Sequence, residues 1–216
     1  MASRKEIVLY SCIVNGRDEP KPCLVDDGFQ RVLFTDNLRL YAPSWEIRPL
    51  EWKCQDPVRT CRYHKHHPFD LFPYAKYAIW LDMTHWPYRS LKPLLTDSVL
   101  SVHRHNERST IKAESKRCAE LQLDDPVLLQ TQAMYYFKEG FQDNYGLYST
   151  SCLVMNNCPI YRQLSEIWWD EVCKWSKRDQ VSLPYCLWRL GIVPDIIPGE
   201  DRNGKNYYFK FKSHYK

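Results

Sequence analysis

The chain has 216 residues, enough for one α/β domain of ordinary size with a sizeable buried core. Its 30 Lys and Arg residues stand against 26 Asp and Glu residues, a net charge of +4 that is too balanced for a protein that holds nucleic acid mainly by neutralising phosphates. A local basic pocket for one small anionic ligand is compatible with this charge. No repeat, linker or composition break divides the sequence, so we expect a single domain over residues 1–216.

Nine cysteines are spread over the chain without any C-x-x-C pair, which argues against a disulfide scaffold and a zinc ribbon. Reduced, mostly buried thiols in a cytosolic setting are favoured. Cys54, Cys61, His64 and His67 lie close in sequence, but their spacing matches none of the usual zinc patterns. The apolar run near the N-terminus is too short to span a bilayer and lacks the layout of a signal peptide. We therefore expect no transmembrane segment and a cytoplasmic location.

Four apolar segments in the first part of the chain predict strands, and polar residues follow three of them. The first is rich in β-branched and aromatic residues and stops at Asn15, the second ends on Asp36, and the fourth, "YAIWLD", ends on Asp82. Polar residues at the carboxyl ends of strands that are separated by longer connections favour an open sheet that binds ligands at those ends. The four strands are expected at residues 6–14, 31–36, 45–50 and 77–82.

The rest of the chain alternates helical and strand-like patterns. A helical turn or loop is expected around Pro93, and the tail from residue 199 reads as a polar loop followed by an aromatic strand. Apolar residues at helical spacing indicate one long amphipathic helix, whose stripe is better explained as core than as a binding surface. Strands are expected at 98–103 and 146–157, and helices at 110–124, 125–140 and 158–179, followed by another apolar helical run within residues 176–191.

The carboxylate at the end of "YAIWLD" is costly to bury unless a partner there needs it. Asp82 can be a simple strand-end cap, but Arg59, Arg62 and Lys65 precede it at a spacing of three, which puts them on much the same face of a helix. Cations beside a lone carboxylate suit a diphosphate with a divalent metal ion. A solvated basic face is the alternative that the pattern leaves open.

Three further residues are candidates for chemistry. Asp179 is expected at a helix start, either as an N-cap or as a carboxylate presented at a cleft, where it can accept a proton from an attacking hydroxyl. Asp143, in "FQDNYG", is a second candidate base, although such an Asp is more often a turn residue. His214 follows an aromatic strand and is either a structural group or a metal ligand brought in by a tail that folds back over the sheet.

These segments, in this order, resemble nucleotide-sugar glycosyltransferases of the GT-A fold. The resemblance rests on "FTDN", "WEIRPL", "DPVRTCRYHKHHPFDLFPYAKYAIWLD", "NYGLYSTSCLVMNN" and "SKRDQVSLPY" and covers residues 6 to 191. The chain is similar to the glycosyltransferase-like family of plant cell-wall and mucilage enzymes, and to the N-terminal glycosyltransferase domain of chlorella-virus proteins that build the capsid glycan. The fold implied is α/β of the GT-A type, with a mixed central sheet flanked by helices in a single domain.

The resemblance also implies roles for single residues and for a cofactor. Asn15 and Asp36 would border the uridine of a UDP-sugar donor, while Arg62 and Lys65 would face its diphosphate. Asp82 would bind Mn²⁺ or Mg²⁺. His214 would complete the metal site. One departure matters, since GT-A enzymes usually carry Asp-x-Asp here and this chain has Thr84 in place of the second carboxylate.

The reaction implied is displacement at the anomeric carbon, with a hexosyl or deoxyhexosyl group passing to a glycan or glycoprotein acceptor. If configuration is inverted, a carboxylate deprotonates the acceptor hydroxyl, and Asp179 is the candidate for that base. If configuration is retained, Asp179 would lie close to the oxocarbenium-like centre. The product is expected to be a viral capsid glycan or a cell-surface glycan, made in the host cytoplasm if the protein is viral.

Two other functions fit the same residues. The first is a degenerate GT-A domain that holds a nucleotide or glycan without turnover, which the absence of a carboxylate at Thr84 favours. The second is a metal-dependent nucleotidyltransferase that uses the same cations and Asp82. Release of a nucleoside diphosphate distinguishes a glycosyltransferase from a nucleotidyltransferase, which releases pyrophosphate.

Overall fold

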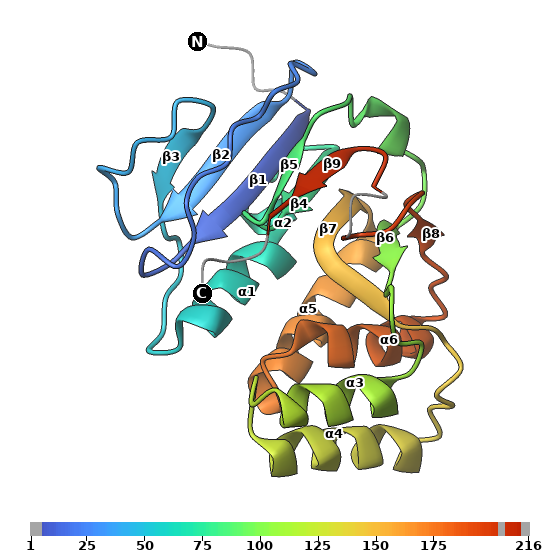
Figure 1. Cartoon of the computed structure of the whole chain (residues 1–216). Coiled ribbons are helices and arrows are strands. Elements are labelled where there is room, and N and C mark those ends of the chain that lie inside the picture. Colours follow the sequence, from blue (N-terminus) through green and yellow to red (C-terminus); the bar gives the residue numbers. More distant parts are fainter. Residues whose placement is uncertain (1–5, 203–205, 213–216) are drawn as a thin grey trace.

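The computed structural model describes residues 6–202 and 206–212. A seven-stranded mixed sheet in the order β3-β2-β1-β4-β7-β6-β8 crosses this part of the chain, and β5 and β9 form a small second sheet (Figure 1). The strands β1 to β4 are parallel, whereas β7 runs antiparallel to both of its neighbours. The strands are β1 Ile7–Ile13, β2 Gln30–Thr35, β3 Glu46–Pro49, β4 Tyr77–Leu81, β5 His85–Pro87, β6 Leu100–Arg104, β7 Tyr148–Asn156, β8 Asp195–Ile196 and β9 Phe209–Phe211.

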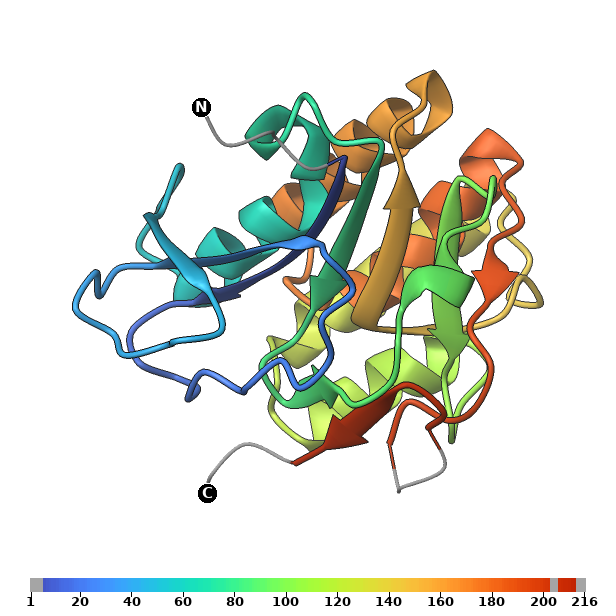
Figure 2. The same cartoon turned by 90° about the horizontal axis from the view of Figure 1, so that it is seen from above.

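The α-helices all lie on one face of the large sheet (Figures 1 and 2). Helices α1 and α5 pack side by side, α6 follows α5, and α3 and α4 form an outer pair. Loops, the short 3-10 helix η1 and the small sheet cover the other face. The helices are α1 Pro57–His66, α2 Pro68–Leu71, η1 Lys92–Leu94, α3 Ile111–Glu120, α4 Pro126–Lys138, α5 Pro159–Lys174 and α6 Asp179–Leu190.

Both faces of the central strands are buried, which explains their nearly continuous apolar sequences. Along β4, Ala78 and Trp80 join the core beneath the helices, whereas Ile79 and Leu81 join the core on the opposite face. This alternation follows from the two-residue period of a strand. It places the next side chain, that of Asp82, on the helix side of the sheet.

The predicted mixed sheet with flanking helices is confirmed, and each expected strand and helix is present with ends shifted by a few residues. The largest shift is at α5, which ends at Lys174 rather than at residue 179. The expected single-domain range of 1–216 stays a prediction, because the terminal residues lie outside the described part. Within residues 6–202 and 206–212, no helix combines the length and the apolar character needed to cross a lipid bilayer.

Candidate functional site

The carboxyl ends of β1, β2 and β4 meet at one edge of the sheet, because the three strands are parallel and adjacent. Asn15 lies just beyond β1 with a φ of 55°, a left-handed conformation that Asn tolerates better than most residues. Its backbone N–H donates to Oδ2 of Asp36, just beyond β2, over 2.9 Å. Two of the predicted donor-site residues are therefore in direct contact at this edge.

Asp82 follows β4 at the same edge and is held in place by its neighbours. Its backbone N–H donates to the carbonyl of Ser151 on β7 over 2.8 Å, and its Oδ1 accepts from the indole N–H of Trp80 over 2.7 Å. The Nζ of Lys65 lies 3.8 Å from the same Oδ1. The side chain of Asp82 keeps 32% of its surface exposed, and its Oδ2 has no hydrogen-bond partner among the described residues.

Helix α1 carries the cations to this edge. It begins after Asp56, whose carboxylate accepts the N–H groups of Val58 and Arg59 as an N-cap does, with Pro57 in the first turn. Side chains on a helix lean toward its N-terminus, which here lies at the ligand-binding edge. Lys65 can therefore start deep in the protein and still extend to Asp82.

Arg62 and Lys65 meet at a third carboxylate, that of Asp179 at the first position of α6. The Nζ of Lys65 lies 2.8 Å from Oδ2 of Asp179, and the Nε of Arg62 lies 3.2 Å from it. The Lys65 side chain has no exposed surface and that of Asp179 has 1%. Since Asp179 binds cations from α1 rather than capping its own helix, the N-cap interpretation of this residue is not supported.

The charges of Arg62, Lys65 and Asp179 decide which side chains in this part of the site carry a proton. Burial alone would raise the pKa of Asp179, but Arg62 and Lys65 outweigh burial and hold that pKa well below its usual range. His66 stacks on Trp168 at a ring separation of 4.0 Å, and burial lowers its pKa to about 3, although Asp179 acts in the opposite direction. Asp179 is thus ionised and His66 neutral near pH 7.

Two thiols lie where β1, which leads to the Asn15–Asp36 contact, meets α1. Helix α1 carries Arg62 and Lys65, which together with Asp179 and Asp82 we call the cation group. Cys12 lies on β1 and Cys61 on α1, where the Sγ of Cys61 lies 3.9 Å from the carbonyl oxygen of Cys12. Asp36 is among the charges that raise the pKa of Cys12, after burial and Cys61. A hydrogen bond with Cys12 lowers the pKa of Cys61, and the charge of Arg62 lowers it further. The strand before Asn15 and the helix that carries Arg62 are thus in contact through these two residues.

The other sequence candidates lie elsewhere. Arg59, expected on the same face as Arg62, instead donates to the carbonyls of Val172 and Trp175 and pairs with Asp56. Asp143 accepts the N–H groups of Ile111 and Lys112 and so satisfies the start of α3 from a distant loop.

Two further residues bear on the predicted metal site: His214 as a proposed ligand, and Thr84 as the residue in place of the second carboxylate. His214 lies outside the described residues. Thr84 is buried, with its Oγ1 2.9 Å from Nδ1 of His85.

A buried carboxylate that the sequence did not indicate lies close to this edge. Asp201 accepts hydrogen bonds from the hydroxyls of Ser149 and Ser151 on β7, and Nε2 of His85 lies 3.1 Å from its Oδ1. Burial would raise the pKa of Asp201, but the hydrogen bond from His85 and those from the serines lower it. No sequence spacing relates Asp201 to partners so distant in the chain, although a lone Asp in a Gly-rich loop between short strands was the available signal.

The described residues contain no group of three or more His, Cys, Asp or Glu side chains arranged to hold a metal ion. This applies to the Cys54, Cys61, His64 and His67 group, in which His64 instead accepts the N–H of Glu51. Asp82 fits one coordination position, because its Oδ2 is a hard oxygen ligand without a hydrogen-bond partner among the described residues, on a side chain that is 32% exposed. The remaining positions would fall to water, the ligand's own oxygens or residues outside the described part.

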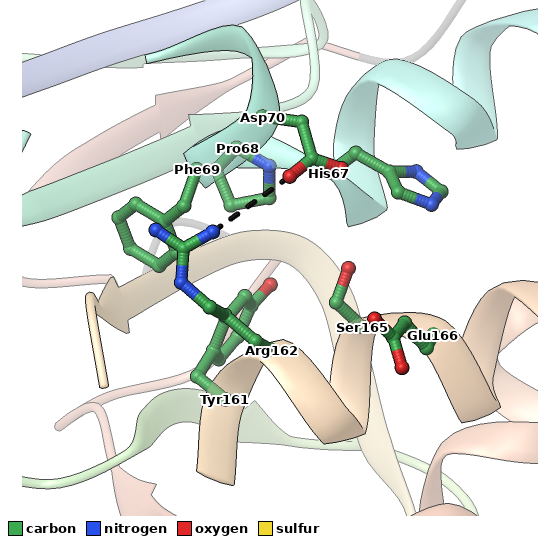
Figure 3. A pocket seen from close by; sticks show the side chains of 8 residues that line it. All are labelled: His67, Pro68, Phe69, Asp70, Tyr161, Arg162, Ser165 and Glu166. Atoms are coloured by element: carbon green, nitrogen blue, oxygen red, sulfur yellow. Dashed lines mark ion pairs between the residues drawn. The ribbon is translucent and has the colours of Figure 1, made fainter. Parts of the chain in front are cut away.

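A separate small pocket lies at the other end of the sheet, where α1 ends and α5 begins (Figure 3). Its volume is about 60 Å³, too small for a sugar ring. Arg162 extends from α5 toward Asp70 on α2, with an N–O distance of 3.7 Å. Eight residues line the pocket: His67, Pro68, Phe69, Asp70, Tyr161, Arg162, Ser165 and Glu166.

A ligand site at the carboxyl ends of adjacent parallel strands, with buried cations beside a half-exposed carboxylate, is typical of open α/β proteins that bind anionic ligands. Residues 45–198, more than half of the chain, match the TOD1/MUCI70 glycosyltransferase-like domain. The chain therefore belongs to the TOD1/MUCI70 glycosyltransferase-like family. No curated protein matches it. The expected relation to a glycosyltransferase-like family is confirmed, and the match supports a transferase that uses a sugar donor and an acceptor.

Proposed function

We propose that the protein is a GT-A type glycosyltransferase that moves a sugar from a UDP-sugar to a glycan or glycoprotein acceptor with the help of Mn²⁺ or Mg²⁺. The observation that carries this proposal is the convergence of Asn15, Asp36 and Asp82 at one sheet edge with the cations of α1. In this assignment Asn15 and Asp36 contact the nucleoside, while Arg62 and Lys65 stabilise the diphosphate.

The charge balance of the cation group supports a requirement for a divalent ion. Arg62 and Lys65 are already matched by Asp179 and Asp82, so the four side chains carry no net charge together. A nucleoside diphosphate would bring several negative charges to a region that has no spare positive charge among these residues. A divalent ion between Asp82 and the diphosphate would supply that charge and would stabilise the leaving group when the bond to the sugar breaks.

The base for the acceptor hydroxyl stays a prediction. Asp179 is the candidate by resemblance, but its side chain has 1% exposure and its lowered pKa makes it a weak base. The contacts favour a positioning role, in which Asp179 fixes the ammonium of Lys65 and the guanidinium of Arg62. If Asp179 acts as the base, the acceptor hydroxyl has to approach it past Arg62 and Lys65.

Calorimetric titration of UDP and several UDP-sugars, with and without Mn²⁺, tests the donor site. We expect binding that depends on Mn²⁺ and is lost in Asp82→Asn, which keeps the size of the side chain and removes the anionic ligand. Asp26→Asn is a matched control, because Asp26 is exposed and pairs with Arg31 away from this edge. Donor binding without Mn²⁺, or unchanged binding in Asp82→Asn, would remove Asp82 from the metal site.

A binding module without turnover is a second candidate function. The buried, bonded Thr84 and the weak basicity of Asp179 favour it, because both leave the site short of a free carboxylate. Incubation of a UDP-sugar with candidate acceptors separates the two functions: a transferase releases UDP, and a binding module releases nothing. Release of pyrophosphate from a nucleoside triphosphate would instead indicate a nucleotidyltransferase.

The biological setting is proposed on the resemblance alone. A viral capsid glycan or a cell-surface glycan is the proposed product, and a hexose or deoxyhexose is the proposed donor sugar. The cytoplasm, of the host if the protein is viral, is the proposed location. Transfer assays with an array of nucleotide sugars and cell-surface or capsid glycan fragments would test the product and the donor together.

A further inference from the structure

Helices α1 and α5 carry an aromatic group that the proposed donor site does not use. Trp52 stacks on Tyr63 with ring centroids 5.0 Å apart, and Tyr63 stacks on His67 at 4.3 Å. Trp169 of α5 meets all three rings edge-on, at 5.3 to 5.5 Å. We call Trp52, Tyr63, His67 and Trp169 the aromatic column.

The aromatic column lies near the surface and apart from the donor-site residues. Tyr63 on α1 and His67, the C-cap residue of that helix, are one turn apart and share a face that differs from the face of Arg62 and Lys65. Trp52, Tyr63 and Trp169 are each only partly buried, in contrast to Trp168, which faces the core with no exposed surface. Trp52 and His67 stack on Tyr63, so a flat apolar surface for a ligand has to come from the partly buried Trp52 and Trp169, whose rings these contacts hold at little cost in conformational entropy.

The column continues into the small pocket of Figure 3, since His67 belongs to both. The Nδ1–H of His67 donates to the carbonyl of Tyr63 over 2.8 Å, because a carbonyl can only accept. Burial lowers the pKa of His67, so the ring is neutral and its Nε2 is an acceptor. This nitrogen has no hydrogen-bond partner among the described residues. A ligand hydroxyl would satisfy it.

The surrounding charges limit the class of ligand. Four carboxylates lie near enough to Tyr63 or His67 to raise the pKa of one or both rings. Among the residues that line the pocket, the one Arg or Lys is Arg162, and it already lies near Asp70. An anionic ligand such as a uronate-containing chain would be repelled, whereas neutral hydroxyls can donate to carboxylates. The four carboxylates are those of Glu51, Asp70, Glu166 and Asp170.

We propose that the aromatic column and the adjoining pocket form a second carbohydrate-binding surface, separate from the donor site, that holds a neutral oligosaccharide. The apolar faces of the sugar rings pack on Trp52 and Trp169, and a hydroxymethyl or hydroxyl group enters the pocket toward His67 and Glu166. The choice of a carbohydrate rests on the proposed glycosyltransferase function. Such a surface would retain a growing glycan between transfer steps.

Binding of neutral oligosaccharides to the whole chain tests this proposal. The probes are oligomers of glucose, galactose, xylose and mannose, with an oligogalacturonide as the anionic comparison, and the readout is the shift of the indole N–H signals of the eight tryptophans in NMR spectra. We expect a neutral oligomer to shift the signals of Trp52 and Trp169 and the oligogalacturonide to shift neither. Shifts confined to other tryptophans, or no shift with any probe, would overturn the proposal.

Variants separate this surface from the donor site. Trp52→Ala is expected to weaken oligosaccharide binding about tenfold, whereas Trp188→Ala, which removes another partly buried tryptophan that packs on Phe141 and Tyr185, leaves binding unchanged. Glu166→Gln serves if Trp52→Ala does not fold, because Glu166 is exposed and the change removes only a charge. Wild-type affinity in both Trp52→Ala and Glu166→Gln would also overturn the proposal.

Asp82→Asn distinguishes a failure of this proposal from a failure of the proposed function. The variant is expected to lose donor binding and to keep oligosaccharide binding. If the protein binds oligosaccharides through Trp52 but binds no UDP-sugar, the proposed carbohydrate-binding surface is supported and the proposed transferase function is not. If it binds a UDP-sugar with Mn²⁺ but no oligosaccharide, the proposed donor site is supported and the second carbohydrate-binding surface is not.

Discussion

Asp179 and Asp201 are two buried carboxylates that the protein stabilises in different ways. Asp201 receives hydrogen bonds from two serine hydroxyls and lies against His85, and the exposed Arg202 adds a longer ion pair with an N–O distance of 3.5 Å. Asp179 instead faces the full charges of Lys65 and Arg62, and Lys65 also lies near the half-exposed Asp82. Asp179 therefore depends on buried counter-charges that lead to Asp82, whereas Asp201 depends mainly on neutral hydrogen-bond donors.

Among the substitutions that test this comparison, Asp179→Asn is expected to have the largest effect on the free energy of unfolding. The variant leaves Lys65 and Arg62 without their buried counter-charge, so we expect the free energy of unfolding to fall by about 3–5 kcal/mol. Urea denaturation followed by circular dichroism measures it. A loss below about 1 kcal/mol would mean that water reaches Lys65 and that the charge group is not buried as described.

Asp201→Asn should cost less, because an amide can still accept hydrogen bonds from Ser149 or Ser151 through its oxygen. We expect a loss of about 1–3 kcal/mol in the same urea experiment, since one of the buried hydroxyls is left poorly paired. A loss equal to that of Asp179→Asn would show that Asp201 depends on the charge of Arg202 as strongly as Asp179 depends on its cations.

Acidic pH should lower the free energy of unfolding through His66, whose Nε2 lies 3.9 Å from Oδ2 of Asp179. Its folded pKa of about 3 lies below the value of 6.5 that the ring has when unfolded, so below pH 6.5 the unfolded chain takes up a proton that the folded chain does not. The free energy of unfolding then falls with decreasing pH by about 1.4 kcal/mol per pH unit from this group. No such contribution exists above pH 6.5.

Urea denaturation between pH 7.5 and pH 4.5 measures this slope, and His66→Phe should reduce it while it keeps an aromatic ring against Trp168. His64, whose pKa burial lowers to about 4, contributes in the same direction and stays in the variant. An unchanged slope in His66→Phe would show that His66 is already protonated in the folded protein, as a strong contact with Asp179 would require.

The smallest effect on stability is expected for Asp82→Asn. Asp82 is half-exposed, an asparagine oxygen can still accept from Trp80, and the Lys65 contact is long at 3.8 Å. We expect a change within about 0.5–1 kcal/mol, measured beside the calorimetric loss of donor binding. A large destabilisation would make Asp82 a structural partner of Lys65 rather than a ligand-binding group.

Local patterns in the sequence predict a large part of the fold and of this site. Buried strands read as apolar runs, so the ends of β1, β2 and β4 and their polar residues Asn15, Asp36 and Asp82 follow from the chain itself. The helical spacing of Arg62 and Lys65 correctly indicates a shared direction. The same spacing is misleading for Arg59, which the carbonyls of Val172 and Trp175 draw away.

Contacts between distant segments could not be read in the same way. Asp201 contacts Ser149 and Ser151, some fifty positions earlier in the chain. Trp52 lies in a loop, where it stacks on Tyr63 and also contacts Trp169 of the distant helix α5. Asp179 was predicted as a functional carboxylate, but its pairing with α1 depends on how α5 and α6 pack. Periodicity describes a single element and carries no information on such pairs.

The buried ammonium of Lys65 also has a consequence for the order in which the chain assembles. Helix α1 is made early in synthesis, yet its lysine has no exposed surface once docked and meets Asp179 more than a hundred positions later in the chain. Until α6 arrives, the only carboxylate described beside Lys65 is Asp82 at 3.8 Å, so the N-terminal strands and α1 lack the closer counter-charge of their final packing. Folding should therefore be cooperative over nearly the whole chain and comparatively slow, since its decisive contact closes a very long loop.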